Sequence, residues 1–378
     1  MRTESEASPS PLNPDSLFLP PDAIAPGDLR RVLVIKLRNL GDVLLTSPVI
    51  SVLKRQAPQL EVDALVYADT ADMLRGHPDL GELHEIHRDW KQLGLFERLR
   101  CEKRLLSALR RRNYDLILNL TDHGRGMWLS RLLRPRYAIA PDVRAGKTYR
   151  SAYTHLYPVI GGNRRHTVEI NLDALRRIGI YPGRDERRLT LLPGEAALAS
   201  VDRALAAAGL KEKSFVLIHP GSRWFFKCWP PDRVAALCTS LASGGLPVAL
   251  VCGPDPLEQR LLEAVKSRTD SVTATFPGNL SLKELAALIG RARLMVGMDS
   301  APMHMAAAIG TPTVAFFGPS GEIEWGPWQV PHRVLTSSHA CRPCGRDGCG
   351  GGKRSECLEE IELPQVLAAV ASLLEETA

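Results

Sequence analysis

Residues 294–321 constrain the fold more than any other stretch, because they predict a strand, a short helix and a second strand in direct succession. An apolar run is followed by the helix-start residue Ser300, and Gly310 ends the helix before the next apolar run. The free N–H groups and positive dipole of such a helix suit a bound phosphate. Asp299 and His304 bracket this predicted site. Alternatively, Asp299 and Ser300 only cap a core helix and His304 is a buried structural histidine.

Strands and helices alternate along both halves of the chain. Nearly all-apolar runs, such as RVLVIK at 31–36 and YDLILNL at 114–120, are typical of strands buried on both faces of a parallel sheet. After a linker rich in Pro and Gly, the alternation restarts with SFVLIHPG at 214–221. The pattern predicts an α/β protein with two doubly wound domains that face each other. We expect a disordered tail at 1–29, a first domain at 30–182 and a second domain at 183–378.

Length and composition limit the class of protein. The 378 residues suffice for two domains, and 44% hydrophobic with 24% charged residues is typical of a globular chain. No apolar run approaches the roughly 20 residues that span a bilayer. The N-terminal segment is rich in proline and lacks the apolar stretch of a signal peptide, so we expect a cytoplasmic protein. The lack of a GxGxxG after the first strand and of a Walker A motif argues against nicotinamide oxidoreductases and P-loop ATPases.

Positive charge is concentrated in one window of the sequence. Between His123 and Val168, nine Lys and Arg residues are accompanied by a single acid, Asp142. A basic surface suits an anionic partner, which can be a phosphorylated substrate, an acidic membrane surface or nucleic acid. The alternative is a solvated face without a partner. The basic residues of this window are Arg125, Arg131, Arg134, Arg136, Arg144, Lys147, Arg150, Arg164 and Arg165.

Two further loops follow strands at equivalent places in the two halves. The turn after the first strand contains Arg38, Asn39, Gly41 and Asp42. There Gly41 lets the backbone approach a ligand, and Asp42 stands at the carboxyl end of the strand, where ligands bind in open parallel sheets. In the second half, the loop HPGSRWFFKCWP at 219–230 offers the Ser222 hydroxyl and the Lys227 ammonium, both of which suit a phosphate.

Together these motifs resemble glycosyltransferase family 9, the ADP-heptose:lipopolysaccharide heptosyltransferases. The resemblance rests on IKLRNLGDVLLTSPVISVLK at 35–54, on the GSxxxxKxWP loop, and on DSAPMHMAAA at 299–308 followed by FFGPSG. Within the family, the first and last of these segments, with VYADT at 66–70, are most similar to the heptosyltransferase III subgroup. The resemblance covers the chain from Arg31 to its C-terminus. It implies a GT-B fold, in which two Rossmann-like domains face a central cleft, the first binding the acceptor and the second the nucleotide-sugar donor.

The resemblance also implies a catalytic residue and an acceptor side. Asp42 matches the general base that takes the proton from the acceptor hydroxyl, and Gly41 forms the turn that presents it. Inner-core lipopolysaccharide carries carboxylates and phosphates, so the basic window is expected to contact the acceptor at the cytoplasmic face of the inner membrane. The acceptor-binding candidates are Arg38, Asn39, Arg144, Lys147 and Arg150.

The donor side is implied by the motifs of the second half. Ser222, Lys227 and the helix start would stabilise the pyrophosphate as ADP leaves. Asp299 is expected to contact sugar hydroxyls or to orient its neighbours, because a carboxylate repels phosphate. Ala301 stands where many family members have glycine, which restricts the backbone there. The predicted donor-binding residues are Ser222, Lys227, Asp299, Ser300, Ala301 and His304.

Four cysteines lie in a Gly-rich segment, CRPCGRDGCGGGKRSEC at 341–357. Four thiols at such spacing can ligate zinc or an iron–sulfur cluster, although the spacing after the CxxC fits no standard zinc module. Alternatively, the four cysteines are reduced and free, or two of them form a redox pair. The predicted catalysis requires neither a metal nor a cofactor. The four residues are Cys341, Cys344, Cys349 and Cys357.

We therefore predict an inverting, metal-independent glycosyltransferase that moves heptose from ADP-L-glycero-D-manno-heptose to a heptose of the lipopolysaccharide inner core. One alternative is another family 9 enzyme with a different acceptor, such as a heptosyltransferase II. Another is a nucleotide-sugar epimerase with the GT-B fold, and a third is a cysteine-cluster protein that binds polyanions. No nucleic-acid-binding motif accompanies the basic window, so we expect no nucleic acid partner.

Overall fold

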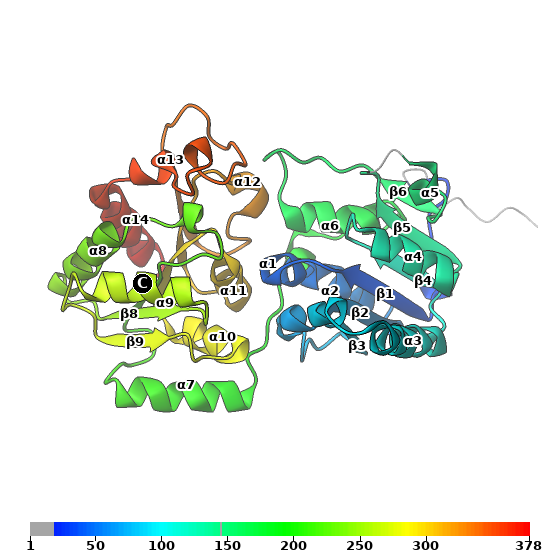
Figure 1. Ribbon diagram of the computed structural model, residues 1–378, viewed down its shortest axis with the longest axis horizontal. Helices are drawn as coiled ribbons and strands as arrows, with labels where there is room; N and C mark the ends of the chain where they lie inside the picture. Colours follow the sequence, from blue (N-terminus) through cyan, green and yellow to red (C-terminus); the bar gives the residue numbers. More distant parts are fainter. Residues whose placement is uncertain (1–18, 144–145) are drawn as a thin grey trace, which may run out of the picture.

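Two parallel six-stranded sheets form the centres of two lobes (Figure 1). The computed structural model describes residues 19–143 and 146–378. The first sheet has the strand order β3-β2-β1-β4-β5-β6, and the second has the order β12-β11-β10-β7-β8-β9. The strands of the first sheet are β1 (Arg31–Lys36), β2 (Glu61–Tyr67), β3 (Leu83–Ile86), β4 (Leu116–Asn119), β5 (Tyr137–Pro141) and β6 (His155–Tyr157). Those of the second are β7 (Val216–His219), β8 (Val248–Cys252), β9 (Ala274–Pro277), β10 (Leu294–Met298), β11 (Thr313–Phe316) and β12 (His332–Leu335).

Both sheets follow one winding scheme. If the strands of each lobe are numbered in chain order from one to six, both sheets read 3-2-1-4-5-6. This is the order of the dinucleotide-binding doubly wound fold, in which the strand order reverses between the first and fourth strands. The central strands β1, β7 and β10 are almost completely buried, as expected where helices cover both faces of a parallel sheet. The prediction of two doubly wound sheets is therefore confirmed.

Helices connect the strands and cover both sheets. The helices of the first lobe are α1 (Leu40–Leu44), α2 (Ser47–Gln56), α3 (Leu95–Arg112), α4 (Gly124–Leu133), α5 (Lys147–Arg150) and α6 (Thr167–Arg176), with short 3₁₀ turns η2 (Pro26–Asp28), η3 (Ala68–Met73) and η4 (Arg88–Lys91). The rest of the chain contains α7 (Glu195–Ala207), α8 (Pro231–Ser243), α9 (Pro256–Lys266), α10 (Leu282–Arg291), α11 (Ala301–Ile309), α12 (Glu322–Trp325), α13 (Glu356–Glu359) and α14 (Leu363–Glu376), with η5 (Arg184–Arg187), η6 (Phe225–Lys227) and η7 (Cys349–Gly351).

The two lobes meet where the carboxyl ends of their strands face each other. Helix α1 of the first lobe packs on α11 of the second, between the two sheets (Figure 1). A second contact joins the lobes away from this point, since the His166 ring stacks on Trp328 at 4.4 Å between ring centres and its Nε2 donates to the Gly326 carbonyl at 2.9 Å. In a third contact, the Lys283 ammonium donates to the Arg75 carbonyl at 2.7 Å. The lobes are thus in contact on several sides of the space between them.

The structure adds elements that the sequence motifs do not give. Two helices, α1 and α2, follow the turn after β1, and Pro48 lies in the first turn of α2. Proline is tolerated there because the N–H it lacks has no partner in a first helical turn. The segment 141–163 contains α5 and β6. The predicted linker is followed by α7. Strands β9 and β12 have only four residues each and partly exposed side chains, so they lack the apolar run of the central strands.

The predicted disordered tail is too long. Residues 1–18 lie outside the described residues, but Ile24 and Leu29 are buried against the first lobe. The Asp22 carboxylate forms an ion pair with Arg177 at 2.7 Å, beyond the end of α6. The prediction is wrong here because two isolated apolar residues among prolines show no periodicity, and their partners come from distant parts of the chain. Across the described ranges, no helix is long and apolar enough to cross a membrane.

Candidate active site

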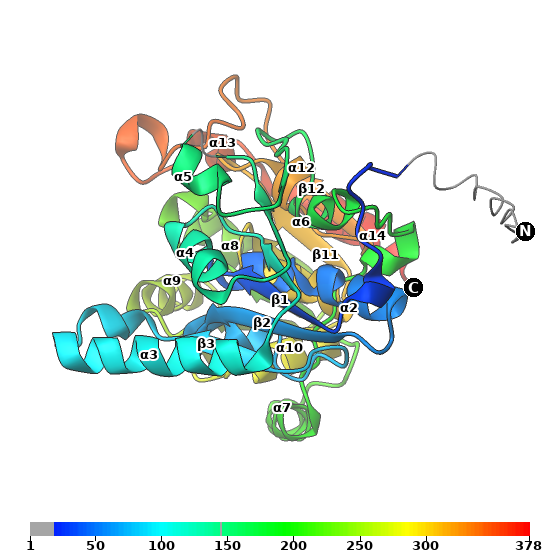
Figure 2. The same cartoon turned by 90° about the vertical axis from the view of Figure 1, so that its right-hand side faces the viewer.

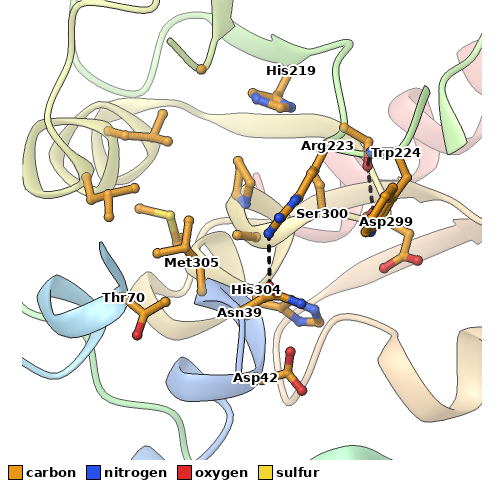
Figure 3. A pocket seen from close by; sticks show the side chains of 18 of the residues that line it. Asn39, Asp42, Thr70, His219, Arg223, Trp224, Asp299, Ser300, His304 and Met305 are labelled. Atoms are coloured by element: carbon orange, nitrogen blue, oxygen red, sulfur yellow. Dashed lines mark hydrogen bonds between the residues drawn. The ribbon is translucent and has the colours of Figure 1, made fainter. Parts of the chain in front are cut away.

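A cavity of about 400 Å³ lies between the lobes and is lined by residues of both (Figure 3). This volume is within the usual range for small-molecule sites. From the first lobe come the turn after β1 and residues of η3, and from the second come the loops after β7, β8 and β10. The structure brings together nine of the predicted site residues here: Asn39, Gly41, Asp42, Ser222, Lys227, Asp299, Ser300, Ala301 and His304.

The position of the cavity follows from the strand order. In the second sheet, β7 and β10 are neighbours, and helices leave them towards opposite faces. Their following loops therefore separate and leave a crevice, which contains Ser222 on one side and Ser300 on the other. In the first sheet, β1 and β4 occupy the equivalent place, and the turn after β1 contributes Asp42. The cavity thus joins the two places where ligands bind in folds of this kind.

On the second lobe, Asp299 and Lys227 form an ion pair. The Lys227 Nζ atom lies 2.5 Å from Asp299 Oδ2, and the Ser320 hydroxyl donates to the same oxygen at 2.5 Å. The Asp299 side chain is only 8% exposed, so this charge-assisted contact is shielded from water. The pair fixes the direction of the Lys227 side chain along the wall of the cavity. The predicted orienting role of Asp299 is compatible with this geometry.

Helix α11 starts at the floor of the cavity. Ser300 is its N-cap residue and makes no side-chain capping bond, Pro302 has no N–H, and the Met303 N–H donates to the Ser300 carbonyl at 3.1 Å. The Ala301 N–H and the positive end of the helix dipole are therefore what this helix start offers an anion. His304, on the first turns, is buried, and its Nδ1 atom has no partner among the described residues. Burial lowers the pKa of His304 to about 4, which makes the ring neutral near pH 7.

On the first lobe, Asp42 lies in the first turn of α1 and is half-buried. In Figure 3 its carboxylate lies below the His304 ring, at the opposite side of the cavity from His219. Gly41 is adjacent, and a β-carbon added there would lie 2.7 Å from His304 Cδ2. A glycine is therefore required for the two lobes to approach this closely. Below the turn, the buried Lys36 ammonium donates to the Leu120 carbonyl at 3.1 Å and the Asn171 side chain at 3.0 Å.

Several residues of the cavity were not predicted. His219 is the last residue of β7 and lies 3.4 Å from a carboxylate oxygen of Glu258, and its Nδ1 atom also lacks a partner in the described chain. Arg223 donates across the cavity to the Asn39 side chain at 3.0 Å, and the exposed Trp224 ring lies beside it. The sequence analysis missed Glu258 because the sequence of α9 contains no polar motif. It missed His219 because this residue ends an apolar run that is typical of a strand.

Three other acceptor candidates, Arg38, Lys147 and Arg150, do not line the cavity. Arg38 forms an ion pair with Asp122 at 2.5 Å, and Arg150 forms one with Asp142 at 2.8 Å. Lys147 is exposed at the start of α5, and no ion pair engages it within the described residues. Arg144 lies outside the described residues.

Acids from outside the basic window neutralise part of it. Arg125 pairs with Glu102, and Arg165 pairs with Asp173 at 2.6 Å. The window is therefore less basic in space than in sequence.

The four clustered cysteines lie in the segment that follows β12. Within residues 19–143 and 146–378, no three His, Cys, Asp or Glu side chains form a group that could bind a metal ion. Cys341, Cys344, Cys349 and Cys357 are all free thiols. The segment also supports the loop after β11, because Arg342 donates to the Gly318 carbonyl at 3.1 Å and pairs with Glu322 at 2.8 Å. The metal alternative stays a prediction.

Comparison with known proteins identifies the family that has this architecture. The family model "Glycosyltransferase family 9 (heptosyltransferase)" matches residues 103–353. Lipopolysaccharide heptosyltransferase 3 of Escherichia coli is 36% identical over 296 residues, which cover 77% of this chain and 84% of that protein.

Solved structures agree in fold. A glycosyltransferase family 9 structure from Veillonella parvula superimposes with a TM-score of 0.78 at 22% identity, covering 94% of this chain and 99% of the other. The E. coli heptosyltransferase WaaC with ADP gives a TM-score of 0.71 at 19% identity, covering 92% and 100%. The GT-B architecture of two facing lobes is therefore confirmed.

Proposed function

This chain belongs to glycosyltransferase family 9, the heptosyltransferases, and on that premise we propose that it transfers heptose from ADP-L-glycero-D-manno-heptose to a heptose of the lipopolysaccharide inner core. The enzyme is a glycosyltransferase. Its 36% identity to a heptosyltransferase 3 supports the III-like acceptor over a II-like one. The family also favours transfer over the epimerase alternative, because an epimerase needs no acceptor side. The observation that carries the proposal is the cavity that contains Asp42 from one lobe and Lys227, Ser300 and His304 from the other.

We assign the pyrophosphate of the donor to the second lobe. The α11 N-terminus offers the Ala301 N–H and the positive end of the helix dipole, Ser222 a hydroxyl, and Lys227 a positive charge. The Nδ1 atom of the neutral His304, which has no partner among the described residues, is a further polar atom that a ligand can engage. Glu258 lines the same cavity, and its carboxylate suits sugar hydroxyls rather than phosphate. Lys227 stays directed at the phosphates through its pair with Asp299.

We assign the proton transfer to Asp42. The acceptor hydroxyl oxygen attacks the anomeric carbon of the donor while its proton passes to the Asp42 carboxylate, and the bond from that carbon to the ADP oxygen breaks. Attack from the side opposite the leaving group inverts the anomeric centre. The charge that develops on ADP is stabilised by Lys227 and the α11 N-terminus, which are in place before the reaction. The protein supplies a base on one lobe and anion donors on the other.

We place the acceptor on the first-lobe side of the cavity, near Asp42 and the exposed Lys147. Lys147 is an exposed cation of the basic window. A lipopolysaccharide precursor is anchored in a membrane by its lipid part, so the enzyme would work at the surface of the cytoplasmic leaflet.

The test is acceptor-dependent release of ADP from ADP-heptose by the purified chain. Three acceptors are compared: an inner core with two heptoses, one with a single heptose, and none. We expect release with the diheptosylated acceptor, and a mass increase of one heptose in the product. Release with the single-heptose acceptor alone would replace the III-like assignment with a II-like one. If no acceptor promotes release and the sugar of ADP-heptose changes configuration, the epimerase alternative holds instead.

A further inference from the structure

The first half of helix α3 carries an exposed apolar group that neither the fold nor the cavity uses. Leu95 is 69% exposed, Phe96 87% and Leu99 56%. Later in the same helix, Leu105 and Leu109 are buried against the sheet. Residues at positions i, i+1 and i+4 fall within an arc of about 100° on a helix, so the three exposed side chains form one stripe. The first half of α3 therefore does not pack on the sheet as its second half does.

Cations surround this stripe. Arg98, Arg100, Lys103 and Arg104 are exposed, and within the described residues none of them forms an ion pair. Two acids are close in sequence, but Glu102 pairs with Arg125, which leaves Glu97 to offset the four cations. An exposed apolar stripe with unpaired Lys and Arg side chains beside it has the composition of a helix that lies in a membrane interface.

The neighbouring helix extends the same surface. Helix α4 lies beside α3, to which it is joined by the Glu102–Arg125 pair and by a bond from Arg110 to the Leu132 carbonyl. It exposes the Trp128 ring at 58%. Tryptophan is favoured at the boundary between headgroups and acyl chains. Figure 2 shows both helices on one side of the first lobe, with α3 projecting beyond it. We call this set the α3 surface: Leu95, Phe96, Leu99, Arg98, Arg100, Lys103, Arg104 and Trp128.

The α3 surface is connected to the mouth of the cavity. Helix α3 follows η4, where Arg88 forms an ion pair with Asp69 at 3.0 Å and donates to the Arg38 carbonyl at 3.1 Å. Asp69 lines the cavity. Leu95 follows Arg88 by seven positions, which limits their distance to roughly 25 Å. A membrane bound at α3 would therefore lie within reach of the acceptor side.

We propose that the α3 surface docks the enzyme on an anionic lipid bilayer, with Leu95, Phe96 and Leu99 inserted at the headgroup boundary. A second copy of the chain is disfavoured, because two such surfaces carry like charge and would repel each other. A soluble sugar chain alone does not explain three exposed apolar side chains in one stripe. Docking deepens the proposed function, since it rests on an acceptor that is held in a membrane.

The test is sedimentation of the full chain with vesicles. One set contains phosphatidylglycerol and phosphatidylcholine in equal parts, and the other contains phosphatidylcholine only. We expect binding to the anionic set, and at least roughly tenfold weaker binding for the variants Leu95→Ser/Phe96→Ser and Arg98→Gln/Arg100→Gln. Leu257→Ser, which changes a leucine that is 50% exposed on α9 of the other lobe, should bind like the wild type.

Three outcomes would overturn the proposal. The wild type fails to bind anionic vesicles, the serine variant binds as the wild type does, or the wild type is a dimer that the serine variant separates in analytical ultracentrifugation. Turnover of a deacylated, soluble acceptor is measured in parallel and should be unchanged in the serine variant. If this turnover is absent from the wild type while vesicle binding still depends on α3, the docking surface stands and the proposed function fails.

Discussion

The two walls of the cavity are built from the same strand, turn and helix, but their carboxylates have different surroundings. On the second lobe, Asp299 follows β10, is nearly buried, and bonds to Lys227 and Ser320. On the first lobe, Asp42 lies in the first turn of the helix after β1 and is half-buried. No hydrogen bond or ion pair engages its carboxylate within the described residues.

This difference shows how one residue type serves two purposes. A carboxylate whose oxygen already accepts from Lys227 and Ser320 is a fixed part of the wall and orients the cation beside it. A half-buried carboxylate that no hydrogen bond or ion pair engages among the described residues has its oxygens available for a substrate proton. Position at the end of a strand therefore locates the site, whereas the role of each acid depends on which other side chains reach it.

The largest effect is expected at Asp42. Replacing Asp42→Asn keeps the shape but removes the proton acceptor, and should lower kcat by roughly 10² to 10⁴-fold. The dissociation constant of ADP should stay the same, because the donor groups lie on the other lobe. Steady-state ADP release and ADP titration by calorimetry measure the two quantities.

The matched control for this variant is Asp232→Asn, an acid in the first turn of α8, away from the cavity. It should retain wild-type turnover. An Asp42→Asn enzyme with more than roughly a tenth of the wild-type kcat would remove Asp42 from the base role.

The next largest effect is expected on ADP affinity when Lys227, the ion-pair partner of Asp299, is replaced. In Lys227→Met the positive charge at the phosphates is lost and the Asp299 carboxylate is left unpaired, so ADP should bind about 100-fold more weakly, which corresponds to about 3 kcal/mol. The double variant Lys227→Met/Asp299→Asn should recover part of this affinity, since the remaining repulsion is removed. Calorimetric titration with ADP measures both.

A solvent-exposed Lys–carboxylate pair serves as the control for Lys227. Lys266 and Glu263 on α9 lie 3.1 Å apart. Lys266→Met should leave ADP binding unchanged, because exposed pairs contribute little and this one is outside the cavity. If the double variant binds ADP no better than Lys227→Met, Asp299 does not act through Lys227.

The sequence predicted the parts of this site that depend on local order. Parallel strands end at one edge of a sheet, so Asp42, Ser222 and Asp299, each shortly after an apolar run, could be placed near one cleft before any contact was known. Ser300 and Gly310 gave the ends of α11 for the same reason, because both signals act on the local backbone.

Contacts between distant segments could not be predicted in this way. Glu102 and Asp173 lie outside the basic window and neutralise Arg125 and Arg165 within it, which no count along the sequence reveals. His219 is the end of a buried strand by pattern, and its place beside the α9 carboxylate results from the packing of two helix–strand units. The different roles of Asp42 and Asp299 likewise depend on tertiary contacts.

Low pH should reduce the stability of the protein through protonation of His304 on the second lobe. Its folded pKa of about 4 lies below the ordinary 6.5, so between these values the unfolded chain binds a proton that the folded chain does not. Stability therefore falls as the pH falls from 6.5, by about 2 kcal/mol between pH 6.5 and 5 for this group. Chemical denaturation of wild type and His304→Gln over this range measures the difference.

The control is a substitution at an exposed histidine, His87→Gln, measured over the same pH range. Equal acid slopes in wild type and His304→Gln would show that protonation of the His304 ring does not reduce the free energy of unfolding.

On the first lobe, Lys36 makes stability depend on pH in the alkaline range. Burial lowers the pKa of Lys36 to about 8, so stability should rise with pH above 8, where the unfolded chain still binds the proton.

The smallest effect is expected where the two walls touch. In Gly41→Ala the new methyl group would lie 2.7 Å from His304 Cδ2, and the buried ring has little room to move, so the lobes must separate slightly. Overpacking of this kind costs about 1 kcal/mol here, which should lower kcat/KM roughly fivefold. Gly27→Ala is the control, since no atom lies within 4 Å of an added β-carbon there. Because the methyl group acts only between the lobes, ADP affinity should change less than turnover does. An equal loss of ADP affinity and of turnover would show that the substitution disturbs the donor-binding residues of the second lobe instead.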